Sequence, residues 1–325
     1  MDIILPHILT RLPAGERLVL CTVVRARGST PQGAGAKMLV LENGKTIGTL
    51  GGGCVEAEVR RRALEILPTG QSQVLSYKLD HDLGWDDGLI CGGMLDVYAQ
   101  ILNPGSLPVF AALSQTLAAG EPGTFAFDYA TPEGNKRYEE QIPPAPTLLI
   151  AGGGHVGLAL AAIAPPLDFR VTIIDDRPEF SSLERFPTAT TRITGEIELE
   201  LSRYPITPQT YIVIVTRGHR GDGRALLAVA RSNAAYIGLI GSNRKVRTIF
   251  GDLYAAGIPR ETLYRIHAPI GLEIGAETVP EIALSIAAEL VAVRRGRDGH
   301  AAPPMALGKD AINTWLEQAR PESIL

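Results

Sequence analysis

Cysteine is scarce in this chain, and the residues that occur form no pattern. Cys21, Cys54 and Cys91 are the only cysteines among 325 residues. An odd number without regular spacing argues against a disulfide framework, and the lack of a C-x-x-C pair argues against a structural zinc site. We therefore expect the reducing environment of the cytoplasm.

Long apolar runs and a strong charge of one sign are also lacking. No apolar run reaches the roughly 18 residues of a membrane span. The first segment is interrupted by Pro6 and Pro13 and has no basic leader, so we predict neither a membrane anchor nor a secretory signal. The formal net charge is −4, and the basic clusters at 60–62 and 294–297 are typical of solvated helix faces or ends. We expect neither nucleic acid nor membrane as a partner.

The length and the apolar content fit two compact domains. Of the 325 residues 45% are hydrophobic, so each half can bury a core of its own. The proline-rich segment 142–146 is a stiff linker that marks the boundary. We predict one domain over 1–144, a second over 145–297, and a tail over 298–325 with one short helix.

The start of the second domain fills the pattern G-x-G-x-x-G directly after an apolar run. Its members are Gly152, Gly153, Gly154, His155, Val156 and Gly157. Glycines at these positions allow a tight turn, close approach to a pyrophosphate and close packing of helix on strand, while the helix N-terminus offers free N–H groups. A glycine turn that merely joins strand to helix is the alternative.

Two acids and an arginine end the next apolar run. Asp175 lies 23 residues after Gly152 and is followed by Asp176 and Arg177. A carboxylate in this place accepts the hydroxyl groups of a ribose. We expect a preference for NAD over NADP, which Arg177 would soften.

Beyond Asp175 strand and helix patterns alternate. Apolar strands are expected at 211–216 and 235–241, with helices between and after them. Ser242 is the expected N-cap of one helix, and Thr278 with Glu281 forms the expected capping box of another. The alternation predicts a Rossmann-like, doubly wound parallel sheet with both faces covered.

The first domain carries two glycine turns, each beside a cysteine. One consists of Gly51, Gly52, Gly53 and Cys54, and the other of Cys91, Gly92 and Gly93. The first leads into a helix, whose N-terminus favours a bound anion and the thiolate of Cys54, and the glycines of the second leave the sulfur of Cys91 open to a large ligand. A small buried cysteine packed at a tight turn is the alternative for Cys54. Cys91 lies next to several carboxylates, which make its surroundings less favourable to a thiolate. Cys21 lies in the apolar run 18–26 and is expected in the core.

The first domain also mixes strand and helix patterns. Asn43–Gly44 between two apolar runs predicts a hairpin, and helices are expected over 55–67 and 107–119. An α/β domain follows from this mixture.

Together these segments resemble the XdhC/CoxI family of xanthine dehydrogenase accessory proteins. The resemblance rests on five ordered motifs: STPQGAGAKMLVLENGKTIGTLGGGCVEAEV, GLICGGMLDVYAQIL, AGGGHVGLALA with IIDDRPEF, YIGLIGSNRKV, and HAPIGLEIGAETVPEIALSIAAELVAVRRG. They run from about residue 18 to 297. The chain departs from the family in having GGG where G-A-G is commoner in the fingerprint, which keeps the three required glycines.

The resemblance implies a function in cofactor maturation. Members of this family have an XdhC/CoxI domain followed by a Rossmann domain, bind molybdenum cofactor (molybdopterin) while a cysteine desulfurase supports its sulfuration, and deliver it to an apo molybdenum hydroxylase of the xanthine dehydrogenase type. The resemblance thus implies an accessory factor rather than a turnover enzyme, and we expect a homodimer. Cys91 is the first choice for the molybdenum ligand and Cys54 the second.

Two other classes of function stay open. An NAD(P)-dependent oxidoreductase of a small substrate would explain the fingerprint, although no acid–base residue for it can be named. A non-catalytic nucleotide-binding interaction module would explain that lack. Whether NAD, NADP or another adenine nucleotide binds the Rossmann half is likewise open.

Overall fold

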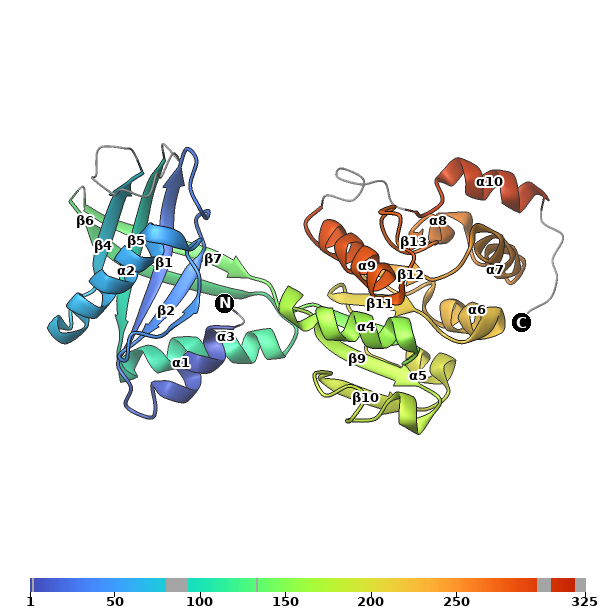
Figure 1. Ribbon diagram of the computed structural model, residues 1–325, viewed down its shortest axis with the longest axis horizontal. Coiled ribbons are helices and arrows are strands. Elements are labelled where there is room, and N and C mark those ends of the chain that lie inside the picture. The colour runs from blue at the N-terminus through green and yellow to red at the C-terminus, as the bar shows by residue number, and fades with distance from the viewer. Residues whose placement is uncertain (2, 80–92, 133, 297–304, 319–325) are drawn as a thin grey trace. The chain divides into compact units, whose positions relative to one another are not determined.

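The computed structural model describes residues 1, 3–79, 93–132, 134–296 and 305–318 of the chain. The chain divides into two compact units, Met1–Pro144 and Ala145–Leu325 (Figure 1). Each unit has its own hydrophobic cores. No helix among these described residues is long and apolar enough to cross a membrane.

A five-stranded antiparallel sheet forms the centre of the first unit. Its strand order is β3-β2-β1-β5-β4, and a separate hairpin pairs β6 with β7. The predicted hairpin at Asn43–Gly44 joins β2 to β3. The strands are β1 (Leu18–Arg27), β2 (Lys37–Leu41), β3 (Thr46–Gly48), β4 (Gln73–Lys78), β5 (Met94–Leu102), β6 (Gly123–Thr131) and β7 (Gly134–Ile142).

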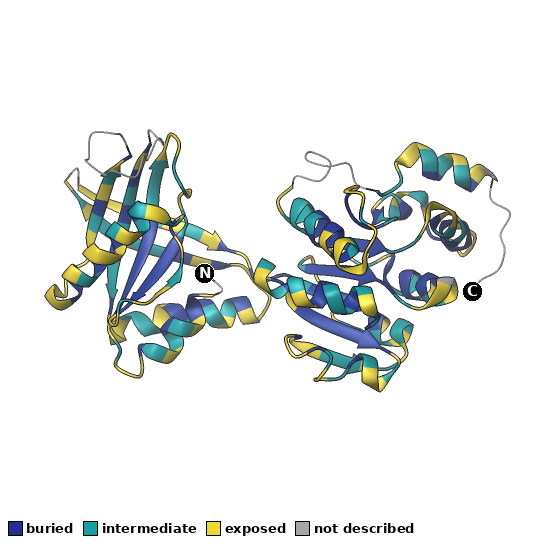
Figure 2. Ribbon diagram, in the orientation of Figure 1, coloured by how far each residue is buried: buried dark blue, intermediate teal, exposed yellow. Residues whose placement is uncertain are grey.

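Helices cover both faces of this sheet, so alternate residues of β1 enter different cores. Leu18 and Leu20 pack with residues of α1, α3 and the hairpin, whereas Val19 and Cys21 pack with residues of α2. Cys21 is fully buried, as predicted, and burial raises the pKa of its thiol to about 12. Figure 2 shows buried strands beneath helices whose outer faces are exposed. The helices are α1 (Leu5–Arg11), α2 (Gly53–Ile66) and α3 (Leu107–Ala118).

A six-stranded parallel sheet forms the centre of the second unit, as the alternation of patterns predicts. Its strand order is β10-β9-β8-β11-β12-β13, with every neighbouring pair parallel. This is the order of the doubly wound dinucleotide-binding fold. The strands are β8 (Thr147–Ala151), β9 (Arg170–Asp175), β10 (Thr191–Thr194), β11 (Thr210–Ile214), β12 (Tyr236–Leu239) and β13 (Ile266–His267).

Helices cover both faces of the parallel sheet, and two expected caps are present. Ser242 accepts a hydrogen bond from the N–H of Lys245 at the start of α7, and Thr278 and Glu281 form the capping box of α9. Each cap satisfies N–H groups that the helix leaves unpaired. The helices are α4 (His155–Ile163), α5 (Ile197–Arg203), α6 (Gly218–Val229), α7 (Asn243–Ala255), α8 (Arg260–Leu263) and α9 (Val279–Arg294).

One further helix lies in the segment predicted as a tail. It is α10 (Lys309–Gln318), and its Ile312 and Leu316 join a buried cluster that includes Val246 and Phe250 of α7. The short helix is therefore part of the packing of the second unit.

Candidate functional site

The first candidate region is the triple-glycine turn of the first unit. Gly51, Gly52 and Gly53 have φ angles of 109°, 76° and 66°, a conformation that side chains with a Cβ rarely adopt. The turn leads directly into α2 and places Cys54 in its first turn, where the free thiol is partly exposed. The sequence prediction of a cysteine at a helix start is confirmed.

The carboxylate of Glu56 accepts hydrogen bonds from backbone N–H groups of this turn. Its Oε2 accepts hydrogen bonds from the N–H of Leu50 at 2.9 Å, the N–H of Gly52 at 3.1 Å and the hydroxyl of Thr49 at 2.5 Å, while the N–H of Gly51 donates to Thr49 Oγ1 at 3.0 Å. Burial opposes the charge on Glu56, but these hydrogen bonds outweigh it and lower its pKa. Glu56 is not among the site residues that the sequence predicts, although an acid in the first turn of the expected helix, four residues after Gly52, is a signal.

Gly53 borders a small hollow of about 190 Å³, which Thr46, Glu56, Ala57 and Arg60 also line. Drug-sized ligands occupy pockets of roughly 300–1,000 Å³. A ligand at this turn would meet this hollow rather than the amides of Leu50 and Gly52, whose hydrogen bonds Glu56 already accepts.

One loop, residues 28–35, lies against glycines of both predicted turns. A Cβ on Gly51 would lie 2.4 Å from the Cβ of Pro31, and a Cβ on Gly93 would lie 2.3 Å from the carbonyl oxygen of Ser29. Such separations exclude any residue but glycine without a shift of the backbone. The structure thus brings Gly51 and Gly93, which are far apart in sequence, to the same loop, whereas Cys91 and Gly92 lie outside the described residues.

A buried lysine anchors the end of this loop. The Nζ of Lys37 donates to the carbonyl oxygen of Gly35 at 2.8 Å and forms an ion pair with Glu140 of β7. The hydroxyl of Tyr138 donates to the same carboxylate at 2.8 Å, and burial together with this carboxylate raises the pKa of Tyr138. Sequence reasoning could not find this contact because its partners are 103 residues apart.

The second candidate region is the glycine fingerprint, at the carboxyl edge of the parallel sheet. Gly152 has a φ of 116°, and a Cβ on Gly157 would lie 2.1 Å from the carbonyl oxygen of Gly152, so both glycines serve the turn and the packing of α4 on β8. A Cβ on Gly154 would meet no atom within 4 Å. His155 is exposed and Val156 partly buried at the start of α4. The open space above Gly154 is where a pyrophosphate lies in this fold.

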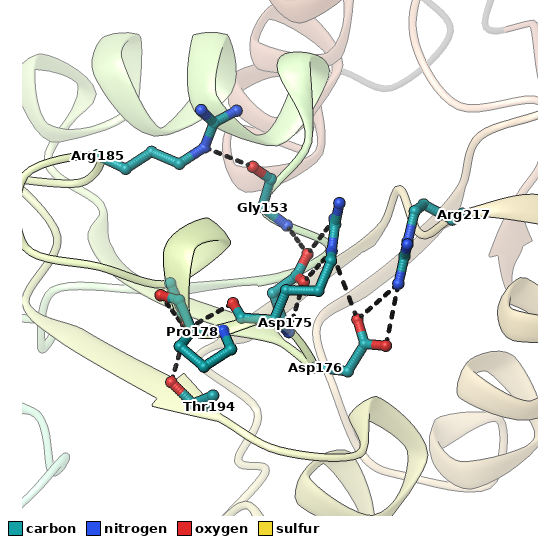
Figure 3. Close-up of polar contacts among 9 residues, drawn as sticks. Gly153, Asp175, Asp176, Pro178, Arg185, Thr194 and Arg217 are labelled. Carbon is teal, nitrogen blue, oxygen red and sulfur yellow. Dashed lines mark hydrogen bonds and ion pairs between the residues drawn. The ribbon is translucent and has the colours of Figure 1, made fainter.

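Asp175 ends β9 beside this turn, and its carboxylate makes four hydrogen bonds. Figure 3 shows its bond from the N–H of Gly153, which is 2.7 Å long. The other three come from Arg177, whose backbone N–H, Nε and Nη2 lie at 3.0, 2.9 and 3.0 Å from the carboxylate oxygens. Burial opposes the charge, but the hydrogen bonds from Arg177 and Gly153 lower the pKa of Asp175. The predicted ribose acceptor is thus paired within the chain.

Asp176 lies beside this pair, with its Oδ1 3.7 Å from Nε of Arg177, and borders a cavity of about 600 Å³. Its carboxylate forms an ion pair with Arg217, Nη2 to Oδ2 3.1 Å, which Figure 3 also shows. The cavity lies between segments that follow β9, β10 and β11. Its lining consists of Asp176, Glu196, Ile197, Glu198, Thr216, Arg217, Arg220, Gly221 and Arg224.

Comparison with known proteins places both units in one family. Residues 12–78 match the model of the XdhC and CoxI family, and residues 148–290 match the model of the XdhC Rossmann domain. A Bacillus subtilis protein, named as a probable subunit of xanthine dehydrogenase, is 28% identical over 86% of this chain and 94% of its own length. The molybdenum cofactor insertion chaperone PaoD of Escherichia coli is 26% identical over 87% of this chain and 85% of its own length.

A solved structure shares the fold. A Bacillus halodurans protein described as a xanthine dehydrogenase superposes with a TM-score of 0.80 at 23% identity, over 91% of this chain and 97% of its own. The order of the two family matches agrees with the order of the two units and with the motifs seen in the sequence. The chain belongs to the XdhC/CoxI family.

Proposed function

We propose that this chain is an accessory factor that binds molybdenum cofactor, supports its sulfuration by a cysteine desulfurase and delivers it to an apo molybdenum hydroxylase of the xanthine dehydrogenase type. The name of the related E. coli chaperone supports molybdenum cofactor as the ligand. The name of the B. subtilis relative supports an enzyme of the xanthine dehydrogenase type as the partner. The homodimeric state and the cytoplasmic location are part of the proposal. The first rests on the family resemblance and the second on the few cysteines without regular spacing.

The observation that carries the proposal is that Gly51 and Gly93 both pack against loop 28–35, and that in the sequence a cysteine lies within three residues of each glycine. Cys54 provides a free, partly exposed thiol next to Gly53. Cys91 is joined through Gly92 to Gly93, which packs against Ser29. Soft thiolate ligands suit a thiophilic metal, and a turn without side chains admits a bulky ligand close to the backbone. These residues fit a pterin cofactor that brings its own metal.

In this proposal Cys91 contacts molybdenum and Cys54 assists from the start of α2. Gly52 and Gly53, where a Cβ would meet no atom within 4 Å, leave room for the pterin. The cofactor supplies the redox-active metal of the partner enzyme, and this chain holds and protects the cofactor until transfer.

We also propose that the Rossmann unit binds an adenine nucleotide. The open space over Gly154, the start of α4 at His155 and the cavity beside Asp176 support this part. They lie at the carboxyl edge of a doubly wound sheet, where ligands of this fold collect.

A cysteine series tests the main proposal. Molybdenum per protein and recovered activity of an apo molybdenum hydroxylase would be measured for Cys91→Ala, Cys54→Ala and, as the matched control in the core, Cys21→Ala. We expect most of both readouts to be lost in the first variant, a partial loss in the second and none in the third. If all three folded variants activate the partner like the parent, ligation by a thiolate is wrong.

A further inference from the structure

The carboxylate of Asp175 has no capacity left for a ribose. Each oxygen accepts two hydrogen bonds, Oδ1 from the backbone N–H and Nε of Arg177, and Oδ2 from Nη2 of Arg177 and the N–H of Gly153. A carboxylate offers about four lone-pair positions. The side chain is only 2% exposed, so a ligand hydroxyl would have to displace Arg177 to reach it.

Arg177 is held in this position from two sides. It forms a two-pronged ion pair with Asp175, and its guanidinium lies 3.3 Å from the centre of the Phe180 ring. Phe180 belongs to the 3-10 turn Pro178–Phe180, whose end packs so closely on Gly153 that a Cβ there would lie 1.8 Å from the Phe180 carbonyl oxygen. Stacking and charge both favour the observed rotamer of the arginine.

The exposed part of Arg177 belongs to a set of arginines at the carboxyl edge. The side chain of Arg177 keeps 20% of its surface exposed, and Nε lies 3.7 Å from Asp176, which borders the cavity of about 600 Å³. Arg217 pairs with Asp176 from the other side of that carboxylate. Arg220 lines the same cavity, and its side chain has no ion pair or hydrogen bond to any residue that the structure describes.

We propose that this site selects adenine nucleotides with a 2′-phosphate, so that NADP-type ligands bind more tightly than NAD-type ligands. The inference rests on the proposed binding of a nucleotide to the Rossmann unit. A ribose with two free hydroxyls needs an acceptor, and Asp175 is taken. A 2′-phosphate is itself an acceptor with a double negative charge. It matches Nη1 of Arg177, the guanidinium nitrogen that makes no bond to Asp175, and the exposed Arg220. The adenine fills the cavity between the segments after β9 and β11.

This preference is the opposite of the one expected from Asp175 in the sequence. The sequence shows the acid at the end of β9 but not its partner. Because Asp175 pairs with Arg177, it holds that arginine in place as a donor to the ligand instead of accepting hydrogen bonds from the ligand itself.

Calorimetry with NADP and NAD on the full chain tests the inference. We expect NADP to bind about 10- to 100-fold more tightly, the range of one or two charged hydrogen bonds. Arg177→Ala should weaken NADP and strengthen NAD, because it removes the phosphate donor and frees Asp175. Arg170→Ala is the matched control, since Arg170 starts the same strand at the opposite edge of the sheet. It should keep the preference of the parent.

Arg177→Lys covers the case in which the alanine variant does not fold. It keeps the charge but not the two-pronged pair, and the preference for NADP should fall without inverting. NAD binding to the parent as tightly as NADP, or an unchanged ratio in Arg177→Lys, overturns this inference and leaves nucleotide binding intact. If the parent binds neither ligand, both the nucleotide proposal and this inference are wrong.

Discussion

Gly153→Ala should loosen the Rossmann unit although the change adds a single methyl group. The new Cβ would lie 1.8 Å from the carbonyl oxygen of Phe180 and 3.2 Å from the ring of Phe186. Neither atom can yield as the tip of a flexible side chain would, so the turn Pro178–Phe180 must move away from the glycine loop. The same shift would weaken the hydrogen bond from the N–H of Gly153 to Oδ2 of Asp175, which is 2.7 Å long in the parent.

The magnitude follows from two contributions. Overpacking of a filled site costs about 1–3 kcal/mol, and a hydrogen bond to a charged group contributes about 1.5–3 kcal/mol. We expect a loss of about 3 kcal/mol in the free energy of unfolding. For a unit of roughly 180 residues this corresponds to a fall of about 6–12 °C in the thermal midpoint.

Scanning calorimetry of the parent, Gly153→Ala and Gly154→Ala provides the assay. Gly154→Ala is the control, because it makes the same change one residue later, where a Cβ meets no atom within 4 Å, and neither glycine has a left-handed φ. Its midpoint should stay close to that of the parent. Equal midpoints for all three proteins would refute the close packing of Phe180 on Gly153.

Three further predictions concern single side chains. Gly154→Val should abolish nucleotide binding in calorimetry while the circular dichroism of the protein stays unchanged, because the valine side chain enters the open space that we assign to a pyrophosphate. Retained binding would show that the pyrophosphate does not lie at Gly154. Cys21→Ala should lower the free energy of unfolding by about 1 kcal/mol or slightly more in a urea titration, with full cofactor retention, since Cys21 is a core residue; any loss of retention would contradict that role. Glu56 has a pKa below its ordinary value of 4.5, so its stabilising contribution is present above that pH and is lost as the pH falls through the lowered pKa. The difference in stability between the parent and Glu56→Gln should therefore shrink as the pH falls below 4.5, and a constant difference would contradict the assigned hydrogen bonds.

The sequence predicts best those features that depend on neighbours along the chain. The hairpin at Asn43–Gly44, the cap at Ser242 and the capping box of Thr278 and Glu281 all follow from local backbone chemistry and are present. The parallel sheet follows from alternating strand and helix patterns. Short elements such as β10, α5 and β13 have too few residues to show a period, and contacts within the folded unit hold them in place.

The candidate sites show where local reasoning ends. A carboxylate at the position of Asp175 predicts a ribose contact, but the rotamer of Arg177 decides whether that carboxylate is free, and that rotamer depends on Phe180. The sequence predicts that the glycines of the first unit form turns, whereas the contacts of Gly51 with Pro31 and of Gly93 with Ser29 depend on how distant segments pack. The sequence pattern predicts that the N–H groups of this turn are free to bind an anion, but in the structure Glu56 accepts their hydrogen bonds.

The cofactor content of the purified protein tests the central claim most directly. The full chain would be isolated from cells that make molybdenum cofactor and, in parallel, from cells that cannot make it, and the released pterin would be quantified by fluorescence after oxidation. The account predicts molybdopterin in the first preparation, none in the second, and uptake by the second when isolated cofactor is added. Protein from cofactor-producing cells that carries no pterin, and that takes up none when it is offered, would contradict the proposed function.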